Sequence, residues 1–436
     1  MEIYILVSGL SNRLKYTFNL VFTTILQTPY KITTNEQEWR EYNGPKMVYG
    51  NQCIEDYFFV KSKGLLFEQG INESEISVDA YKNTKIIYCT PHNKLFPFDV
   101  FSAVFFMASR YEEYLPHKRD IHDRFEATES LAFKEGFLNQ AVVHWWCEFL
   151  WEELQVRFPE IKREKRKFKF ITTIDVDNAF AYKQKGFVRS FAGVVKNIIQ
   201  LNFKQLKERL LVLIGKKQDP YDTFNDQFKW IKQYNLEVIY FILLGDYGYN
   251  DKNVPFTSLQ LQSLIKSLQD YAKVGIHPSY GSNNHLKQLQ KEVDRLSFII
   301  HQEVKYSRQH YLKLKFPSTY RNLIELDILH DYTMGYACRY GFRAGICVPY
   351  YFYDLDLEQI TKLQIHPFAI MEGTLMDYMR VDTDEALEYF YQMIDEVKAV
   401  NGEFISLWHN HVLQKTGEWK PWREIFEKMI IYAQQK

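Results

Sequence analysis

The chain has 436 residues, of which 46% are apolar and 25% charged, so it is long enough for one to three globular domains with a large core. Lysine plus arginine and aspartate plus glutamate both number 54, and this net charge of zero gives no reason to expect nucleic-acid binding. The five cysteines contain no CxxC pair, which argues against a disulfide framework or a thiolate zinc site.

The sequence shows neither a secretory signal nor a membrane-spanning segment. The N-terminal sequence lacks the basic start, apolar stretch and small-residue cleavage site of a secretory signal. The longest strongly apolar strand-like run, at about Val238–Leu244, is far shorter than the roughly 18 residues that a membrane span needs. We therefore expect a soluble protein in the reducing cytoplasm.

The first part of the chain, residues 1–165, mixes strand-like and helical patterns. A helix is expected over residues 99–115, since Asp99 is a typical N-cap, and another over residues 140–158. Short strand-like runs occur at 3–7, 47–50, 57–60 and 85–89. This mixture predicts a smaller α+β domain of unknown role, followed by a basic, solvated linker.

From residue 166 to residue 436 strand patterns alternate with helical patterns. Helices are expected at 258–272 and at about 285–301, and strands at 168–174, 236–244, 274–276 and 404–408. Repeated strand–helix units predict an α/β fold with a parallel sheet, closed or nearly closed as a (β/α) barrel. In such folds the chemistry gathers at the C-terminal ends of the strands.

Those strand ends carry polar side chains. The first strand ends in Asp175 and Asp177, and buried carboxylates without partners are costly, so a pair at a strand end calls for a reason. The strand at 274–276 is followed by His277, and the last one by His409. Carboxylates and imidazoles at several strand ends of one barrel suit a divalent metal with an acid and a base beside it.

A basic insertion, which we place at about 183–230, follows the first strand of this sheet. Residues 183–217 hold nine lysines or arginines and one acidic residue, Glu208, and apolar residues recur among them at roughly helical spacing. Two interpretations are open. The segment is a pair of helices with a solvated basic face, or it is an amphipathic lid that makes a peripheral contact with an anionic membrane or holds an anionic glycan.

Residues from about 168 to 412 resemble the NodB-type polysaccharide deacetylases of carbohydrate esterase family 4, which share a distorted (β/α) barrel. TTIDVD is similar to the first motif of that family, GIHPSY to the second, RQHY to the third and ISLWHN to the fifth. By this resemblance Asp175 is the catalytic base and His409 the catalytic acid. Asp177 and His277 are then ligands of a divalent metal, which we expect to be zinc.

One position departs from the family pattern. The second motif normally has another histidine four residues after the first, and that position is Gly281 here. We name His285, four residues further on, as the third ligand, with His310 as another substitute. A rewired metal site, a weak site and a barrel that has lost catalysis all remain open. By the resemblance Arg308 lines the substrate groove. We also expect substrate-binding side chains at Tyr280, His310, Arg343 and Trp408. For Arg308 and Arg343 a structural ion pair is the alternative.

The expected function follows from the resemblance. It implies a metal-dependent hydrolase that removes an N-acetyl group from a carbohydrate, in the setting of cell-surface glycan biosynthesis. The alternative is a catalytically inactive protein of the same fold that binds a glycan or a partner protein. The sequence of the N-terminal part resembles an uncharacterised domain that precedes deacetylase-like barrels in a group of bacterial proteins. The sugar and the oligomeric state are not predicted.

Overall fold

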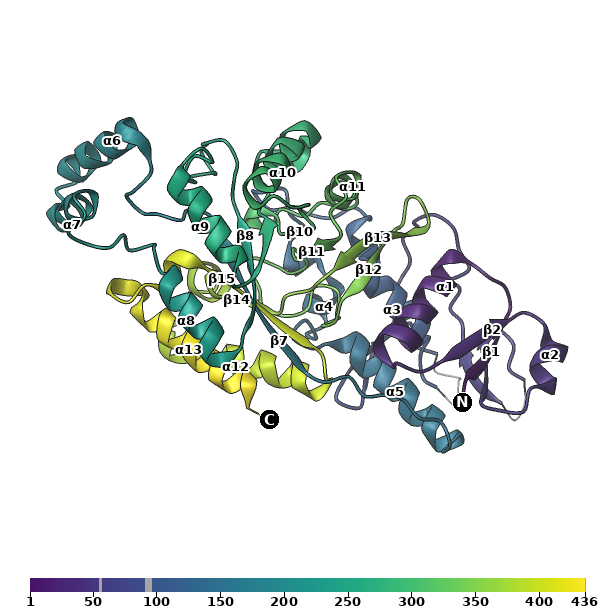
Figure 1. Cartoon of the computed structure of the whole chain (residues 1–436). Coiled ribbons are helices and arrows are strands. Elements are labelled where there is room, and N and C mark those ends of the chain that lie inside the picture. Colours follow the sequence, from purple (N-terminus) through teal and green to yellow (C-terminus); the bar gives the residue numbers. More distant parts are fainter. Residues whose placement is uncertain (55–56, 91–95, 436) are drawn as a thin grey trace.

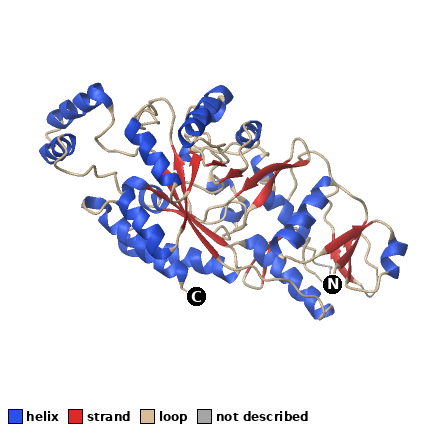
Figure 2. Cartoon of the chain, in the orientation of Figure 1, coloured by secondary structure: helices blue, strands red, loops and turns tan. Residues whose placement is uncertain are grey.

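The structure is a computed structural model of the chain, and it describes residues 1–54, 57–90 and 96–435. Figure 1 shows a small N-terminal sheet at one end of an elongated molecule, a larger sheet in the middle and a pair of helices, α6 and α7, at the opposite end. Figure 2 shows that helices surround the strands of the larger sheet.

The N-terminal sheet is parallel throughout. Its order is β2 (Tyr30–Thr33), β1 (Ile3–Val7), β3 (Lys46–Gly50) and β4 (Phe58–Lys61). All residues of β1 and β3 are buried, as expected for central strands of a covered parallel sheet. The helices α1 (Asn12–Phe18) and α2 (Glu36–Glu41) lie in the connections, because parallel neighbours require crossovers. The predicted mixture of strands and helices is present, with this sheet parallel, and among the described residues β5 (Val78–Tyr81) and β6 (Thr84–Ile87) form an antiparallel hairpin.

The two helices predicted in this part are present, but one is shorter than expected. The predicted helix over 99–115 is α3 (Val100–Ala108), whose N-cap Asp99 accepts a hydrogen bond from the Ser102 backbone N–H. Beyond α3, Arg110 adopts a left-handed conformation with φ 55° and its buried side chain bonds Glu113. The second predicted helix is α5 (Val142–Arg157).

The larger sheet contains all four strands predicted after residue 166. Every neighbouring pair is parallel except β12 with β13. The strand pairs give an order with two ends, so they do not show a closed barrel. That order is β12 (Tyr350–Asp354), β13 (Gln359–Ile365), β11 (His330–Asp331), β10 (Tyr306–Ser307), β9 (Lys273–Ile276), β8 (Glu237–Ile242), β7 (Lys169–Val176), β15 (Glu403–His409) and β14 (Ile370–Met371).

Helices pack around this sheet and bury its apolar side chains. The predicted helices at 258–272 and 285–301 are confirmed as α9 and α10, and Ser258 caps α9 by accepting from the Leu261 N–H. Trp408 of β15 is fully buried, stacked on Phe390 and edge-on to Phe426. The helices are α8 (Phe224–Tyr234), α9 (Leu259–Gln269), α10 (Leu286–Ile300), α11 (Ser318–Glu325), α12 (Thr383–Ala399) and α13 (Lys420–Gln434).

Buried charges join the N-terminal part to the larger sheet. Glu113 accepts hydrogen bonds from Arg110 and from Arg343, each at 2.8 Å, and all three side chains are buried. Arg13 of α1 pairs in the same way with Glu358, which precedes β13. These contacts cross between segments far apart in the chain, so no local pattern could reveal them.

The basic insertion forms two helices that project from the body of the molecule, α6 (Gly186–Ile199) and α7 (Phe203–Leu213). We call residues 183–218 the α6–α7 hairpin. Within the described residues no helix combines the length and the apolar character needed to cross a membrane.

Candidate metal centre and active site

Several strands of the larger sheet end at the same edge, and their ends bring the polar residues together. His409 of β15 is opposite Asp175 of β7 in the strand register, and Val176 is opposite Ile242 of β8. Ile242 in turn pairs with Ile276 of β9, so His277 follows β9 level with the end of β7, with β8 between the two strands. Parallel strands expose their carboxyl ends at one edge, and this edge is where chemistry is expected.

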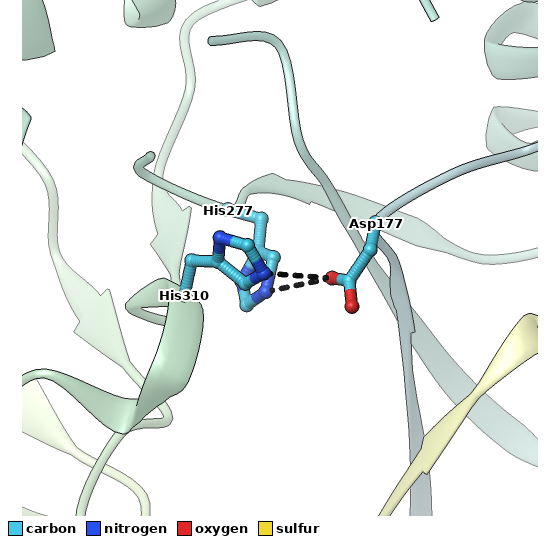
Figure 3. Close-up of side chains that lie close together, drawn as sticks. All are labelled: Asp177, His277 and His310. Atoms are coloured by element: carbon cyan, nitrogen blue, oxygen red, sulfur yellow. Dashed lines mark ion pairs between the residues drawn. The ribbon is translucent and has the colours of Figure 1, made fainter. Parts of the chain in front are cut away.

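Asp177, His277 and His310 form a compact group at this edge (Figure 3). One ligand atom from each side chain lies within 4.8 Å of the others. The Asp177 Oδ1 atom is 3.2 Å from His277 Nε2 and 3.7 Å from His310 Nε2. Figure 3 shows both imidazole rings pointing toward the carboxylate from one side. Two nitrogens and an oxygen therefore converge on one point.

Both imidazoles are held in orientation from behind. His277 Nδ1 donates to the backbone carbonyl of Arg308 at 2.6 Å, and His310 Nδ1 lies 2.9 Å from Asp251 Oδ1. These bonds leave the Nε2 atom of each ring directed at Asp177. Outer-shell acceptors of this kind are the usual way in which proteins fix the tautomer and the angle of metal-binding histidines.

The residues present fit a divalent cation. Asp177 Oδ1 and His277 Nε2 are buried, and neither makes a hydrogen bond to any described residue. Buried polar atoms without hydrogen-bond partners are costly and uncommon. Two such atoms that face each other suit a cation bound between them. A set of two imidazole nitrogens and one carboxylate oxygen suits zinc and leaves a position open for a reactant.

The charges of the group support the same conclusion. Burial opposes ionisation of Asp177, but His310 and His277 outweigh it and hold the pKa of that carboxyl well below its usual range. Burial also lowers the pKa of His310, yet Asp177 and Asp251 together raise it to about 9. Both carboxylates thus attract positive charge to this point, and a cation competes there with the proton on the ring.

Asp175 lies beside the group and is fixed by Arg308. Its side chain is 2% exposed, and its Oδ1 accepts a hydrogen bond of 3.1 Å from Arg308 Nη1. The same nitrogen donates to Thr173 Oγ1 at 2.6 Å, and Arg308 Nε donates to the Tyr332 carbonyl at 3.0 Å. Arg308 is fully buried, so it positions Asp175 and does not line the open groove expected from the sequence.

His409 stands on the other side of Asp177 with a carboxylate behind it. Its Nε2 is 3.8 Å from Asp177 Oδ2, and its Nδ1 is 2.6 Å from Glu372 Oε1, which also accepts from the His409 backbone N–H. Burial lowers the pKa of His409, but Glu372 outweighs it and raises that pKa to about 10. The ring is therefore protonated at neutral pH, as a general acid requires.

Three residues expected at the site lie elsewhere. His285 is exposed at the start of α10, and it is His310, not His285, that lies with Asp177 and His277. Trp408 is a core residue, packed between α12 and α13. Arg343 pairs with Glu113 at the contact between the two parts of the chain.

Tyr280 lies next to the site without lining its cavity. Its backbone N–H donates to Asp251 Oδ1 at 2.9 Å, and its ring packs edge-on to Tyr311. Gly281, at the position of the missing histidine, faces Gln288: a Cβ atom there would lie 3.3 Å from the amide nitrogen.

A cavity of about 230 Å³ opens above the metal group. Asp175, Asp177 and His409 line it, together with two residues that the sequence analysis missed, Glu372 and Arg124. Arg124 comes from the N-terminal part. Its side chain pairs with Asp120 and donates to the Tyr311 carbonyl at 2.6 Å. Glu372 follows a strand of only two residues, and Arg124 lies in a loop, so neither had a periodic pattern to mark it.

Comparison with known proteins gives one family match. The model of a family of unknown function (DUF7033) matches residues 3–159, which lie in the N-terminal part. No curated protein matches the chain in sequence.

Among solved structures, similar ones include carbohydrate esterase family 4 proteins at low identity. A provisionally assigned polysaccharide deacetylase from Mycobacterium smegmatis is 12% identical, with a TM-score of 0.39, over 62% of this chain and 86% of that one. A CE4 family pseudoenzyme from Bacillus anthracis is 12% identical, with a TM-score of 0.30, over 62% of this chain and only 61% of its own length. A polysaccharide deacetylase from Bacillus cereus is 11% identical, with a TM-score of 0.29, over 61% and 86%. Likenesses of this size do not establish an activity.

Proposed function

We propose that this protein is a metal-dependent hydrolase that removes the N-acetyl group from a carbohydrate. The observation that carries the proposal is the group Asp177, His277 and His310, whose ligand atoms lie within 4.8 Å of one another. A buried carboxylate, Asp175, and a protonated histidine, His409, flank it. The substrate class comes from the resemblance of the strand-end motifs to those of the polysaccharide deacetylases.

Each side chain then has one task. Asp177, His277 and His310 would hold the cation, with Asp251 and the Arg308 carbonyl fixing the two rings. When bound, a divalent cation lowers the pKa of water and polarises a carbonyl oxygen.

Asp175 acts as general base. Its carboxylate takes a proton from water as the water oxygen adds to the carbonyl carbon of the acetamide. Arg308 and Thr173 hold the base in place, because the guanidinium bridges the Asp175 carboxylate and the Thr173 hydroxyl. Positioned bases of this kind contribute roughly a hundred- to ten-thousandfold in rate.

His409 acts as general acid. As the C–N bond of the acetamide breaks, the amine nitrogen takes the proton from His409 Nε2, and the products are acetate and a free amino sugar. The buried Glu372 keeps the acid charged and fixes its ring. Tyr311 and Tyr378 line the same cavity and offer aromatic faces against which a sugar ring can pack.

Metal analysis of purified protein tests the ligand set. We expect one zinc per chain after zinc-replete purification, lost in His310→Ala and in Asp177→Ala. His285→Ala is the matched control, since it removes an imidazole that the sequence nominated and the structure places on the surface. Zinc retained in His310→Ala but lost in His285→Ala would contradict the assignment.

Acetate release from oligomers of N-acetylglucosamine tests the reaction. The zinc-loaded protein should release acetate, and His409→Gln should retain zinc but lose most of the rate. A protein that binds both zinc and the oligomer but releases no acetate would instead be the catalytically inactive glycan-binding alternative.

A further inference from the structure

The α6–α7 hairpin is anchored firmly at its base. The buried carboxylate of Asp219, which follows the hairpin, accepts hydrogen bonds from the backbone N–H groups of Ala181, Tyr182 and Lys183, which precede or begin it. Arg189 also donates to the carbonyls of Lys252 and Asn253, each at 3.0 Å. The two ends of the hairpin are therefore joined to each other, and α6 is tied to the loop that contains Lys252 and Asn253.

Polar side chains hold the two helices of the hairpin together. Asn197 of α6 donates to Gln205 of α7 at 2.5 Å and accepts from Arg209 Nε at 3.0 Å. Gly193 allows the close approach, since a Cβ atom there would lie 2.3 Å from an Arg209 guanidinium nitrogen. The inner side of α6 is thus its polar side.

The apolar side of α6 faces solvent. Phe187 is 85% exposed, Phe191 60% and Ile199 75%. The rings of Phe187 and Phe191 stack on each other, so they form one continuous apolar surface. The exposed apolar residues of α6 are Phe187, Val188, Phe191, Val195, Ile198 and Ile199, which recur along one side of a helix. Contiguous apolar surface of this kind marks an interaction site, whereas single exposed residues do not.

The hairpin also carries exposed lysines on both of its helices and just after α7. Exposed lysines occur at Lys196, Lys204, Lys207, Lys216 and Lys217, and the one acidic residue of the hairpin, Glu208, pairs with Lys217. On α7, the exposed residues Phe203, Lys207 and Leu210 follow at i, i+4 and i+7, so apolar and cationic side chains share one side of the helix.

We infer that the α6–α7 hairpin is a docking site for an anionic lipid bilayer, in which the apolar side of α6 enters the headgroup region while the lysines contact lipid phosphates. An interfacial helix combines a strong apolar side with a basic flank, and neither helix of the hairpin is long and apolar enough to cross a membrane. A second copy of the chain fits less well, because face-to-face hairpins would bring two clusters of lysines together. This inference goes beyond the proposed hydrolysis and does not depend on it.

Flotation with vesicles tests the charge requirement. The full-length protein should float with vesicles of equimolar phosphatidylcholine and phosphatidylglycerol at low salt, less at high salt, and not with phosphatidylcholine alone. The triple variant Lys196→Glu, Lys204→Glu, Lys207→Glu should lose on the order of a hundredfold in partitioning. The matched control reverses three exposed lysines elsewhere, Lys266→Glu, Lys287→Glu and Lys428→Glu, and should float much as the native protein does.

A second pair of variants tests the apolar contact. Phe187→Ser with Phe191→Ser should weaken flotation, while Phe298→Ser should not, although Phe298 is 66% exposed on α10. A tryptophan reporter gives an independent readout, because the hairpin has no tryptophan of its own. Fluorescence of Phe191→Trp should be quenched by brominated lipid, and the added fluorescence of Phe298→Trp should not.

Three outcomes would overturn the inference. One is absence of native flotation with anionic vesicles. Another is equal binding to neutral and anionic vesicles. The third is a dimer in light scattering that the hairpin variants convert to a monomer without any vesicle binding, which would show that a second copy covers the surface. Circular dichroism of each variant confirms that loss of binding is not loss of fold.

Discussion

The strand-end site and the α6–α7 hairpin, which begins six residues after Asp177, distribute polar and apolar atoms in opposite ways. At the strand ends, charged side chains are buried: Asp175 is 2% exposed and Arg308 fully buried. In the hairpin, large apolar side chains are exposed, Phe187 by 85%. Both arrangements are costly for a chain alone in water.

The two regions differ in how that cost is met. Most buried charges of the strand-end site have a partner within the chain, such as Arg308 for Asp175 and Glu372 for His409. Two buried atoms without a hydrogen-bond partner, Asp177 Oδ1 and His277 Nε2, face the point where a cation fits. The exposed rings of the hairpin contact mainly each other. The side chains of the first region are thus held in place by contacts within the chain, whereas the apolar side of α6 lacks such contacts and would be buried only against another surface.

The largest expected effect is on catalysis. Asp175→Asn keeps the shape of the side chain but removes the base, so the rate of acetate release should fall by about a thousandfold or more. Zinc content should not change, because Asp175 is not one of the three ligands. The control is Asp270→Asn, on the surface after α9, which should leave the rate unaltered. Loss of zinc in Asp175→Asn would contradict the base assignment.

The next effect concerns the buried charges that join the two parts of the chain. Glu113→Ala leaves Arg110 and Arg343 buried without their shared carboxylate, so the free energy of unfolding should fall by about 3–5 kcal/mol. Glu36→Ala removes an exposed partner of Arg40 and should cost no more than about 1 kcal/mol. Urea unfolding measures both. Equal losses of unfolding free energy in the two variants would mean that burial does not strengthen the Glu113 pairs relative to the exposed Glu36–Arg40 pair.

A smaller effect should appear as a pH dependence of stability. Burial lowers the pKa of His144 to about 3, and its Nε2 accepts from the Cys347 N–H at 3.2 Å. Because an unfolded histidine has a pKa of about 6.5, the unfolded chain binds more protons between these values, and stability falls as pH drops below 6.5. This one group lowers the free energy of unfolding by about 2 kcal/mol at pH 5 relative to pH 7.

The variant His144→Gln isolates that contribution. Its amide offers an acceptor for the Cys347 N–H but does not titrate, so its unfolding free energy should depend less on pH than that of the native protein. Identical pH profiles for the two proteins would show that His144 is not kept neutral by the fold.

The smallest effect is expected in the hairpin. Phe191→Ser removes an exposed ring, so the free energy of unfolding in the absence of lipid should change by no more than about 0.5 kcal/mol. Phe105→Ala, at a fully buried position of α3, should cost about 3–5 kcal/mol. Thermal unfolding compares them. A large loss of unfolding free energy in Phe191→Ser would mean that the Phe191 ring packs against the rest of the chain. The hairpin would then not differ from the strand-end site in the way described.

Much of the strand-end site could be predicted because its signals are local. The strands before Asp175, His277 and His409 have apolar runs that end abruptly, and parallel strands place their carboxyl ends at one edge. The structure brings these three residues and Asp177 together as expected. The parallel sheet itself follows from the alternation of strands and helices.

The remainder depends on contacts that no local pattern records. The strands β10 and β14 have two residues each, too short for any periodicity, and they precede His310 and Glu372 respectively. The sequence analysis favoured His285 as third ligand because of its spacing from His277. The structure favours His310, which follows β10, the strand paired with β9, and lies 3.7 Å from Asp177.

The sequence by itself determined the strand–helix alternation, the carboxylate pair of Asp175 and Asp177, and the amphipathic, basic character of the α6–α7 hairpin. These features depend on residue type and spacing along one segment. The folded chain was needed to see that His310 lies with Asp177 and His277, that Arg308 holds Asp175, and that the apolar side of α6 faces outward. These depend on which segments meet, and the free energy that selects such contacts comes from packing and charge pairing across the whole fold.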